Sequence, residues 1–173
     1  MTDGLIVAAG AGFLCVFGVA LLVYYIFLRL LLRAQYAVLS AQIPGAIITP
    51  CSAALVTRLA LRRIGEATGN SFGSTGPVYS VAAYPGHLRV LRGKSAVVVA
   101  EFGQEEISDV RVGTTSFLLA DFTTLFVGIR AAGTTFELPI RVNGPHSTSI
   151  YTARRDWAAE RGNSMLKHIG APT

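Results

Sequence analysis

The stretch LFVGIRAAGTTFELPIRV, residues 125–142, has the pattern of two β-strands joined by a tight turn. Apolar residues alternate with other residues on both sides of Ala132-Gly133, which is the period of a half-buried strand, and a Gly in a two-residue turn favours a hairpin. Pro139 has no N–H for a neighbouring strand, so the second strand is expected at a sheet edge or a bulge. This stretch therefore predicts an antiparallel hairpin in a mainly-β domain.

Segments of the same kind precede the hairpin and are separated by turn residues, with one tight turn expected at Arg92-Gly93-Lys94-Ser95. A closing helix is expected at 152–169, although Gly162-Asn163 weakens its middle by roughly 1 kcal/mol. The apolar residues with which this helix can cover a sheet are Trp157, Ala158, Met165, Leu166 and Ile169. The predicted strands are 78–84, 87–92, 95–102, 107–112, 116–119, 124–131 and 134–142. Residues 78–173 thus predict a small β-barrel or sandwich with a C-terminal helix.

Three features of residues 86–142 carry a family resemblance: the hairpin over 87–102, the acidic and apolar segment 105–110, and the late hairpin that ends in 136–140. With the closing helix, they resemble a bacterial pleckstrin-homology-like or GRAM-like domain. The resemblance implies a module that binds lipid or protein and has no catalytic residues. It also places Arg89, Arg92 and Lys94 where eukaryotic members hold phosphoinositides.

The N-terminal part of the chain carries no charged residue between Gly4 and Leu28, and this run ends in Tyr24, Tyr25, Arg29 and Arg33. A helix of this length reaches roughly 37 Å, enough to cross a hydrocarbon core of about 30 Å. A cleaved signal, the alternative, needs bases before the apolar run, but here Asp3 precedes it and the bases follow. Residues 1–33 are therefore predicted to be a retained transmembrane anchor.

Orientation follows from the same bases, because Lys and Arg close to a span stay on the cytoplasmic side. The N-terminus is predicted outside and the rest of the chain in the cytoplasm, since the bases that follow the span are Arg29, Arg33, Arg58, Arg62 and Arg63. The Ala-, Gly- and Arg-rich composition suits a bacterial plasma membrane. A second crossing over 34–57 is the alternative, but it would export three of these arginines.

Residues 34–65 are predicted to be a membrane-proximal helical segment. The first helix can continue to Pro44-Gly45, and a second is favoured over 49–65, with Thr49 as N-cap and Pro50 at the first helical position. Alternation within 55–61 leaves a strand as the other possibility. The apolar face expected of this helix comprises Val56, Leu59, Ala60 and Ile64. A flexible loop over 66–77, rich in Gly, Ser and Thr, separates this segment from the β domain.

The net charge of +5 and the pI of about 9.6 come from dispersed bases, and only 14% of residues are charged. Without a Lys/Arg-rich run, nucleic acid is not an expected partner. Anionic lipid is an expected partner, because each base near such a surface contributes about 1 kcal/mol of binding free energy. On the predicted second helix, Arg58, Arg62 and Arg63 form either a headgroup-binding side or an ordinary solvated face.

Residues that resemble catalytic motifs do not combine into a site. Gly93-Lys94-Ser95 lacks the first Gly of a P-loop, and the histidines at 87, 146 and 168 are scattered. His146-Ser147 has no identifiable orienting acid, and Cys15 and Cys51 form no ligand cluster. No enzymatic activity, metal or cofactor is predicted.

Small residues recur along the anchor with spacings of 4, 3, 4 and 3, which places them on one side of a helix and lets another helix approach closely in lipid. This small-residue stripe comprises Gly4, Ala8, Ala11, Cys15 and Gly18, with Gly12 beside them. The alternative is that Gly and Ala are simply common in spans. The chain is predicted to be a membrane-anchored interaction protein, an accessory or scaffold subunit that binds another membrane protein or itself. The second hypothesis is a module that senses anionic lipid.

Overall fold

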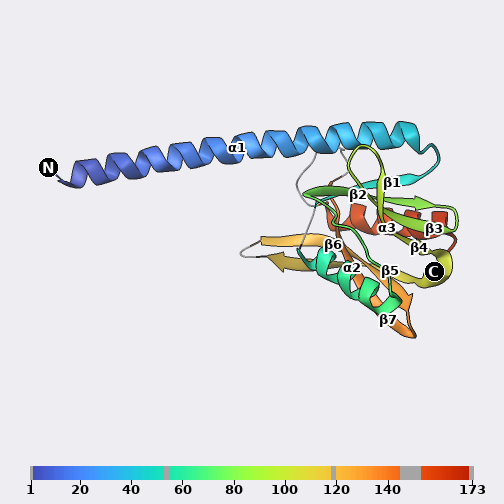
Figure 1. Cartoon of the computed structure of the whole chain (residues 1–173). Helices are drawn as coiled ribbons and strands as arrows, with labels where there is room; N and C mark the ends of the chain where they lie inside the picture. The colour runs from blue at the N-terminus through green and yellow to red at the C-terminus, as the bar shows by residue number, and fades with distance from the viewer. Residues whose placement is uncertain (1, 53–54, 118–119, 145–152, 172–173) are drawn as a thin grey trace.

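The computed structural model describes residues 2–52, 55–117, 120–144 and 153–171, with side chains from residue 15 onward except at 117 and 120. A long N-terminal helix extends from a β-rich domain (Figure 1). In chain order the elements are α1 (Thr2–Gln42), β1 (Ile47–Ser52), α2 (Leu55–Thr68), β2 (Val78–Tyr84), β3 (His87–Arg92), β4 (Val97–Gly103), the 3-10 turn η1 (Gln104–Glu106), β5 (Ile107–Phe117), β6 (Ala120–Ala131), β7 (Thr134–Arg141) and α3 (Arg155–Ile169).

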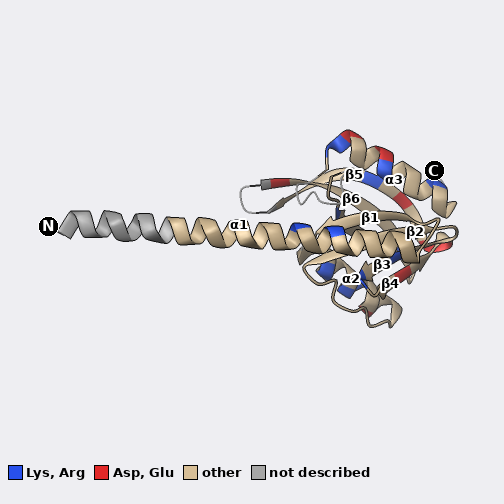
Figure 2. Ribbon diagram, turned by 90° about the horizontal axis from the view of Figure 1, so that it is seen from above, with Lys and Arg blue, Asp and Glu red and all other residues tan. Residues whose placement is uncertain are grey.

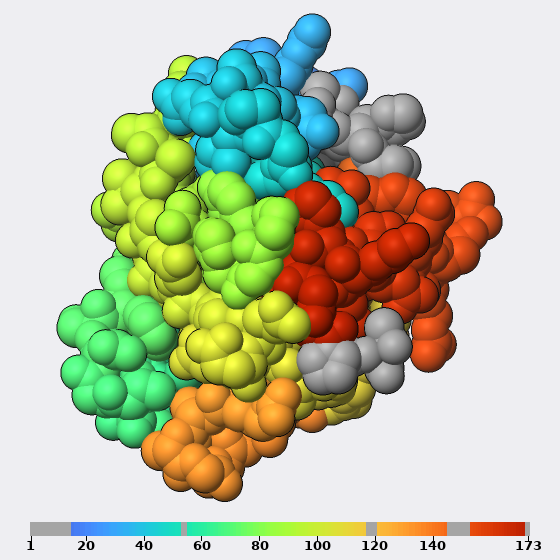
Figure 3. Space-filling view, turned by 90° about the vertical axis from the view of Figure 1, so that its right-hand side faces the viewer, coloured from blue at the N-terminus to red at the C-terminus, as the bar shows by residue number. Residues whose placement is uncertain are grey.

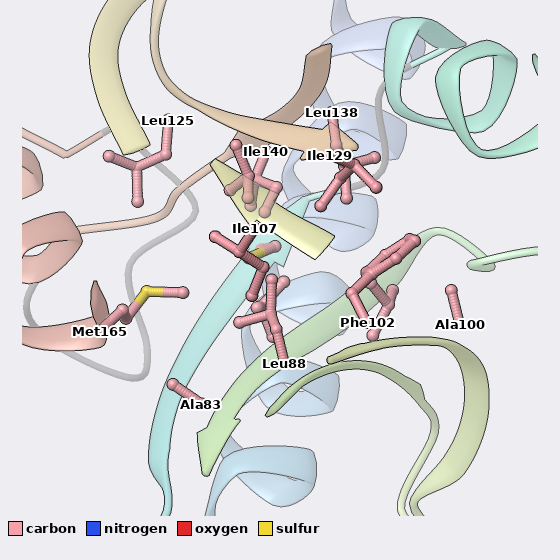
Figure 4. Close-up of a cluster of buried hydrophobic side chains, with 14 of the residues drawn as sticks. Ala83, Leu88, Ala100, Phe102, Ile107, Leu125, Ile129, Leu138, Ile140 and Met165 are labelled. Carbon is pink, nitrogen blue, oxygen red and sulfur yellow. The ribbon is translucent and has the colours of Figure 1, made fainter. Parts of the chain in front are cut away.

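The strands form two antiparallel sheets, β1-β2-β3-β4 and β5-β6-β7. The sheets make a sandwich and not a closed barrel, and in the described residues an isolated bridge between Cys51 and Val142 joins β1 to the end of β7. Between the sheets lies one apolar core, to which Phe102, Ile107 and Ile129 contribute fully buried side chains (Figure 4). The prediction of a mainly-β domain with an N-terminal apolar helix and a C-terminal helix is confirmed.

The hairpin over 125–142 is confirmed in its details. Ile129 pairs with Phe136, and Ala132 and Gly133 both have positive φ, 49° and 76°, as a two-residue turn requires. β7 lies at the edge of its sheet, where Pro139 is tolerated. The segments predicted at 107–112 and 116–119 belong to one strand, β5, up to Phe117; residues 118 and 119 lie outside the described residues.

The prediction that a helix begins at Thr49 is wrong. Residues 47–52 form β1, an edge strand in which Pro50 pairs with Ser80, and α2 begins only at Leu55. Pro50 is compatible with both positions, because an edge strand and a first helical turn each tolerate the missing N–H. The buried face of α2 also differs from the predicted apolar face, since Val56 and Leu59 are 43% and 46% exposed. Its buried residues are Thr57, Leu61, Ile64 and Gly65.

α1 is a single helix of 41 residues whose last turns pack on the domain. Leu39 is fully buried against Ile48, Ala82 and Leu91, on the face of the β1–β4 sheet opposite to the main core. Gln35, also buried, donates from Nε2 to Ser80 Oγ at 3.3 Å. We call residues 31–42 the docked segment of α1. The helix that leaves the domain is therefore also part of its fold.

α3 closes the sandwich from the side, as Figure 3 shows from the end opposite to the N-terminus. Gly162 sits against the β5–β6 sheet so closely that a Cβ there would lie 3.1 Å from Val110 Cγ1 and 3.2 Å from Leu125 Cδ2. Arg161 ties the same helix to β1 by donating to Thr49 Oγ1 at 3.0 Å and to the Ile48 carbonyl at 2.5 Å. The glycine that weakens the helix thus permits its close packing.

Candidate functional site

The part of α1 that precedes the docked segment has described side chains from Cys15 to Leu30. Most side chains from Cys15 to Leu30 are exposed, and Cys15–Gln42 is the one helix with described side chains that is long and apolar enough to cross a membrane. Nothing lies within 4 Å of a Cβ built on Gly18. The other members of the small-residue stripe, Gly4, Ala8, Ala11 and Gly12, lie where only the backbone helix is described. The packing role of the small-residue stripe stays a prediction.

Two of the predicted lipid-facing bases lie beside α1 where it meets the domain. Arg92 and Lys94 line a hollow of about 330 Å³ together with Leu31 and Gln35 of the docked segment. Its remaining walls are Gly76, Pro77, Val78 and Gly93. Because Leu31 lies between Arg29 and Arg33 in the helix, the bases of α1 and those of the β3–β4 turn lie at a similar height along its axis.

Arg58 extends this basic region onto α2. It donates from Nη2 to the Gly76 carbonyl at 3.0 Å, and Arg92 donates from Nη1 to the Ser74 carbonyl at 3.1 Å. Both guanidinium groups thereby hold the segment that leads into β2, and each keeps further N–H groups for other acceptors. We call Arg29, Arg33, Arg58, Arg92 and Lys94 the basic collar, because Arg92, Lys94 and Gly76, which accepts from Arg58, line one hollow with Leu31, and Leu31 lies between Arg29 and Arg33 in α1. Figure 2 shows the basic residues of α1 and of the neighbouring α2 in blue.

The other predicted bases are placed elsewhere. Arg62 forms an exposed ion pair with Glu66 at 2.8 Å along α2. Arg89 lies 3.1 Å from Glu101 and 5.0 Å above the Tyr84 ring, and its hydrogen bond with Glu101 raises its pKa. Because Arg89 is already neutralised by an acid, the structure does not join it to Arg92 and Lys94 as the family resemblance implied.

A second hollow, of about 420 Å³, runs between α2 and the β5–β7 sheet. We call it the α2 groove. Its floor is apolar, whereas Arg63 and Glu137 lie at its rim, and Glu137 also forms an ion pair with Arg111. It is lined by Val56, Leu59, Ala60, Arg63, Phe126, Phe136, Glu137 and Pro139.

Sequence reasoning missed the α2 groove, although one signal for it exists. Leu125 and Val127 are fully buried on the core side of β6, yet Phe126, which points to the other side, is also large and apolar. Pro139 repeats this pattern on β7: its neighbours Leu138 and Ile140 face the core, whereas Pro139, also buried, lines the α2 groove. Apolar residues on both sides of a hairpin indicate that something covers its second face.

Several of the residues that resemble catalytic motifs lie in or next to β3. His87 stacks on Tyr84 with ring centroids 4.7 Å apart, and Gly93-Lys94-Ser95 lies in the connection from β3 to β4. In the searched part of the chain, no group of three or more His, Cys, Asp or Glu could hold a metal ion. His146 and Ser147 lie outside the described residues. Burial raises the pKa of the Cys51 thiol, which makes it a poor nucleophile.

Comparison with protein-family models, with curated proteins and with solved structures gives no significant match. The coarse architecture, an apolar N-terminal helix joined to a β-sandwich, agrees with the expected fold class, and the pleckstrin-homology-like resemblance gains no independent support. A functional argument has to start from the exposed helix, the basic collar and the α2 groove.

Proposed function

We propose that this chain is a membrane-anchored interaction protein, an accessory or scaffold subunit of a membrane protein assembly. In this proposal α1 is retained as a single anchor, its N-terminus lies outside, and the domain lies at the cytoplasmic face of a bacterial plasma membrane. The observation that carries it is the division of α1 into an exposed apolar part, from Cys15 to Leu30, and a docked segment built into the domain.

The energetics of α1 favour a bilayer around its exposed part. Leaving apolar surface in water costs about 25 cal/mol per Å², and most side chains of this part are exposed. The basic collar lies where this part joins the domain, as expected at an anionic membrane face. In lipid the small-residue stripe can then bring a second helix close.

The docked segment also argues for an adaptor. A flexible linker between the helix and the domain would leave the position of the domain unfixed. Here Leu39 and Gln35 of α1 are instead buried against the sheet that they contact. Any surface of the domain is thereby held at a fixed height above the membrane. A scaffold subunit needs such a fixed position, and the pleckstrin-homology-like resemblance, which implies docking without catalysis, fits the same role.

The test is a gentle-detergent purification of the full-length chain, with mass spectrometry of the proteins that accompany it. A stripe variant changes Ala8, Ala11, Cys15 and Gly18 to Leu. A matched control changes the same number of residues to Leu on another side of the helix, roughly 100–160° around the axis from the stripe, namely Ala9, Val16, Ala20 and Val23. We expect a defined membrane protein, or a self-oligomer, that the stripe variant loses and the control keeps. Loss in both variants, or no companion with the unchanged chain, would contradict the proposal.

The native Cys15 offers an independent measurement of self-association. It is exposed in the anchor, whereas Cys51 is fully buried. If the stripe joins two copies, oxidation of membranes should give a disulfide-linked dimer that Cys15→Ser abolishes and Cys51→Ser does not. If the unchanged chain stays monomeric after oxidation, in a preparation that contains no other protein, the stripe has no partner.

The second candidate, recognition of anionic headgroups, is favoured by the hollow beside Leu31, where Arg92 and Lys94 meet the docked segment. Since β1 and α1 are part of the fold, this candidate is tested on the full chain in nanodiscs of neutral or anionic lipid. Headgroup binding predicts slower hydrogen exchange at residues 92–97 with anionic lipid only, reversed by high salt and by a double Arg92→Gln and Lys94→Gln variant. An Arg62→Gln variant is the control, because Arg62 is paired with Glu66. Equal exchange in both lipids would exclude this candidate.

A further inference from the structure

One side of α2 is apolar and largely exposed. The α2 residues that line the α2 groove recur at i, i+3, i+4 and i+7, which places them on one side of the helix. They are Val56, Leu59, Ala60 and Arg63. Leu55, which precedes them, is 65% exposed, so three large apolar side chains of one short helix face away from the core. Single exposed apolar residues are ordinary, but a cluster of them marks an interaction site.

The opposite wall of the groove is held in a fixed shape. The Phe126 ring lies so close to Gly113 that a Cβ built there would be 2.7 Å from Phe126 Cε2, and Arg111 Cζ lies 5.1 Å from the centroid of the same ring. α2 is tied to this wall, because the Thr57 hydroxyl donates to the Pro139 carbonyl at 2.6 Å. A groove that exists before a partner arrives costs little to occupy, since its side chains are already ordered.

The hydrogen bonds of β7 disfavour an added strand as the occupant of the groove. β7 is the edge of its sheet, and edge strands can recruit a further strand through free N–H and C=O groups. At the groove, Pro139 has no N–H, and its carbonyl already accepts from Thr57. A helix needs no such groups, because its backbone hydrogen bonds are internal and its side chains recur with the spacing of those on α2. The groove therefore favours a second helix.

The charges at the rim indicate the polarity of that helix. Glu137 forms an ion pair with Arg111, and Arg62, the neighbour of Arg63, forms one with Glu66. Arg63 itself has no ion pair with any residue that the structure describes. A cation without a partner at the edge of an apolar groove favours a segment that carries an acid, because complementary charges give an interface its specificity.

We infer that the α2 groove binds an amphipathic helix of a partner protein, with apolar side chains at i, i+3 or i+4 and i+7 against Leu59 and Phe126 and an acidic side chain against Arg63. This inference rests on the proposed function, because it names a partner for the domain of an interaction protein. The hollow of about 420 Å³ lies within the roughly 300–1,000 Å³ of ligand pockets. The groove lies on the side of the domain away from α1 (Figure 1), so it is a different surface from the small-residue stripe.

The experiment selects peptides that bind the full-length chain in nanodiscs of neutral lipid. One display library has an Ala-rich helical scaffold about 18 residues long, because shorter helices are marginal in water. A second library of the same length carries a central proline, which prevents a continuous helix. The remaining positions vary in both. We expect binders from the helical library only, with apolar residues at i, i+3 or i+4 and i+7 and an acid beside them.

Two variants of the chain locate the selected peptides. Leu59→Ser should weaken their binding roughly tenfold or more, whereas Val97→Ser, at a β4 residue of similar exposure, should not. Arg63→Glu should weaken binding, whereas Arg62→Glu, on the same helix but outside the groove, should have a smaller effect. Changing the acid of the peptide to Lys should weaken binding to the unchanged chain and restore it to the Arg63→Glu chain.

Four results overturn the inference: no enrichment from either library, enrichment from the proline library, binders without an acid, or binding that survives Leu59→Ser. A lipid in the groove overturns it as well. Native mass spectrometry of the chain released from nanodiscs would then show a bound lipid that Leu59→Ser removes and Val97→Ser keeps. A companion protein that only the stripe variant loses, together with any of these results, removes this inference and leaves the proposed function in place.

Discussion

Leu39→Ala is expected to release α1 from the domain without unfolding the sandwich. Leu39 is fully buried, and its neighbours Ile48, Ala82 and Leu91 form a cluster separate from the main core. Removing a fully buried leucine side chain destabilises a protein by about 2–5 kcal/mol. Because the cluster joins only the docked segment to one face of one sheet, this loss falls on the docking of α1.

A loss of about 2–5 kcal/mol corresponds to a roughly 30-fold to several-thousand-fold larger fraction of undocked helix. The assay is hydrogen exchange of the full-length chain in nanodiscs. Amides of residues 31–42 should exchange faster by a factor in that range, since an undocked end of about three turns has little helical stability of its own. Amides of the β6 core, around Val127 and Ile129, should keep their rates.

The control is Leu22→Ala, the same chemical change at a site that is 58% exposed in the part of α1 that precedes the docked segment. It should leave the exchange of residues 31–42 unchanged. The reasoning is refuted if Leu39→Ala leaves those amides as protected as before. It is also refuted if β6 loses protection by the same factor, because α1 would then be an inseparable part of one cooperative core.

Three further predictions concern the domain itself. Arg161→Met should lower the free energy of unfolding in urea by about 1.5–3 kcal/mol, because the bonds to Thr49 Oγ1 and the Ile48 carbonyl are lost, and Glu160→Met, at an exposed neighbour, should change it little. Gly65→Ala should destabilise the protein, because the added Cβ would lie 2.6 Å from the Asn70 carbonyl oxygen. Helix propensity alone predicts the opposite, a gain of about 1 kcal/mol. Ala67→Gly, in the same helix, should destabilise it by helix propensity alone. Burial raises the pKa of Cys51 and of Tyr79, so the folded state keeps protons that the unfolded state releases, and the free energy of unfolding should fall as the pH rises above about 8.5. Cys51→Ala should remove the first part of that fall, and Tyr79→Phe should remove the part above about pH 10. A urea midpoint that does not change with pH would contradict both assignments.

The strands of the sandwich could be predicted because their alternation is local. Val81 and Val90 lie on the buried side of β2 and β3, and their neighbours along each strand belong to the other face. β1 could not be predicted in this way. Its six residues include Pro50 and no charge, and a short uncharged run has the same appearance as a strand or as the start of a helix. Only pairing with β2, a contact some thirty residues away along the chain, decides between them.

The candidate sites show the same limit. Bases were visible in the sequence, but their grouping was not, because the meeting of Leu31 and Gln35 with Arg92 and Lys94 depends on the docking of α1. The α2 groove was equally hidden, because its walls belong to α2 on one side and to β6 and β7 on the other. Local periodicity predicts helices and strands, whereas the candidate sites depend on where these elements end and on how they pack together.

The arrangement of α1 and α2 has a consequence for how partners reach the domain. α2 lies on the far side of the domain from α1 (Figure 1), so the α2 groove is separate from the exposed part of α1. A helix that packs on the anchor and a segment that fills the groove could therefore bind at the same time without competing. An assembly in which occupation of the groove displaces the anchor partner would contradict this geometry.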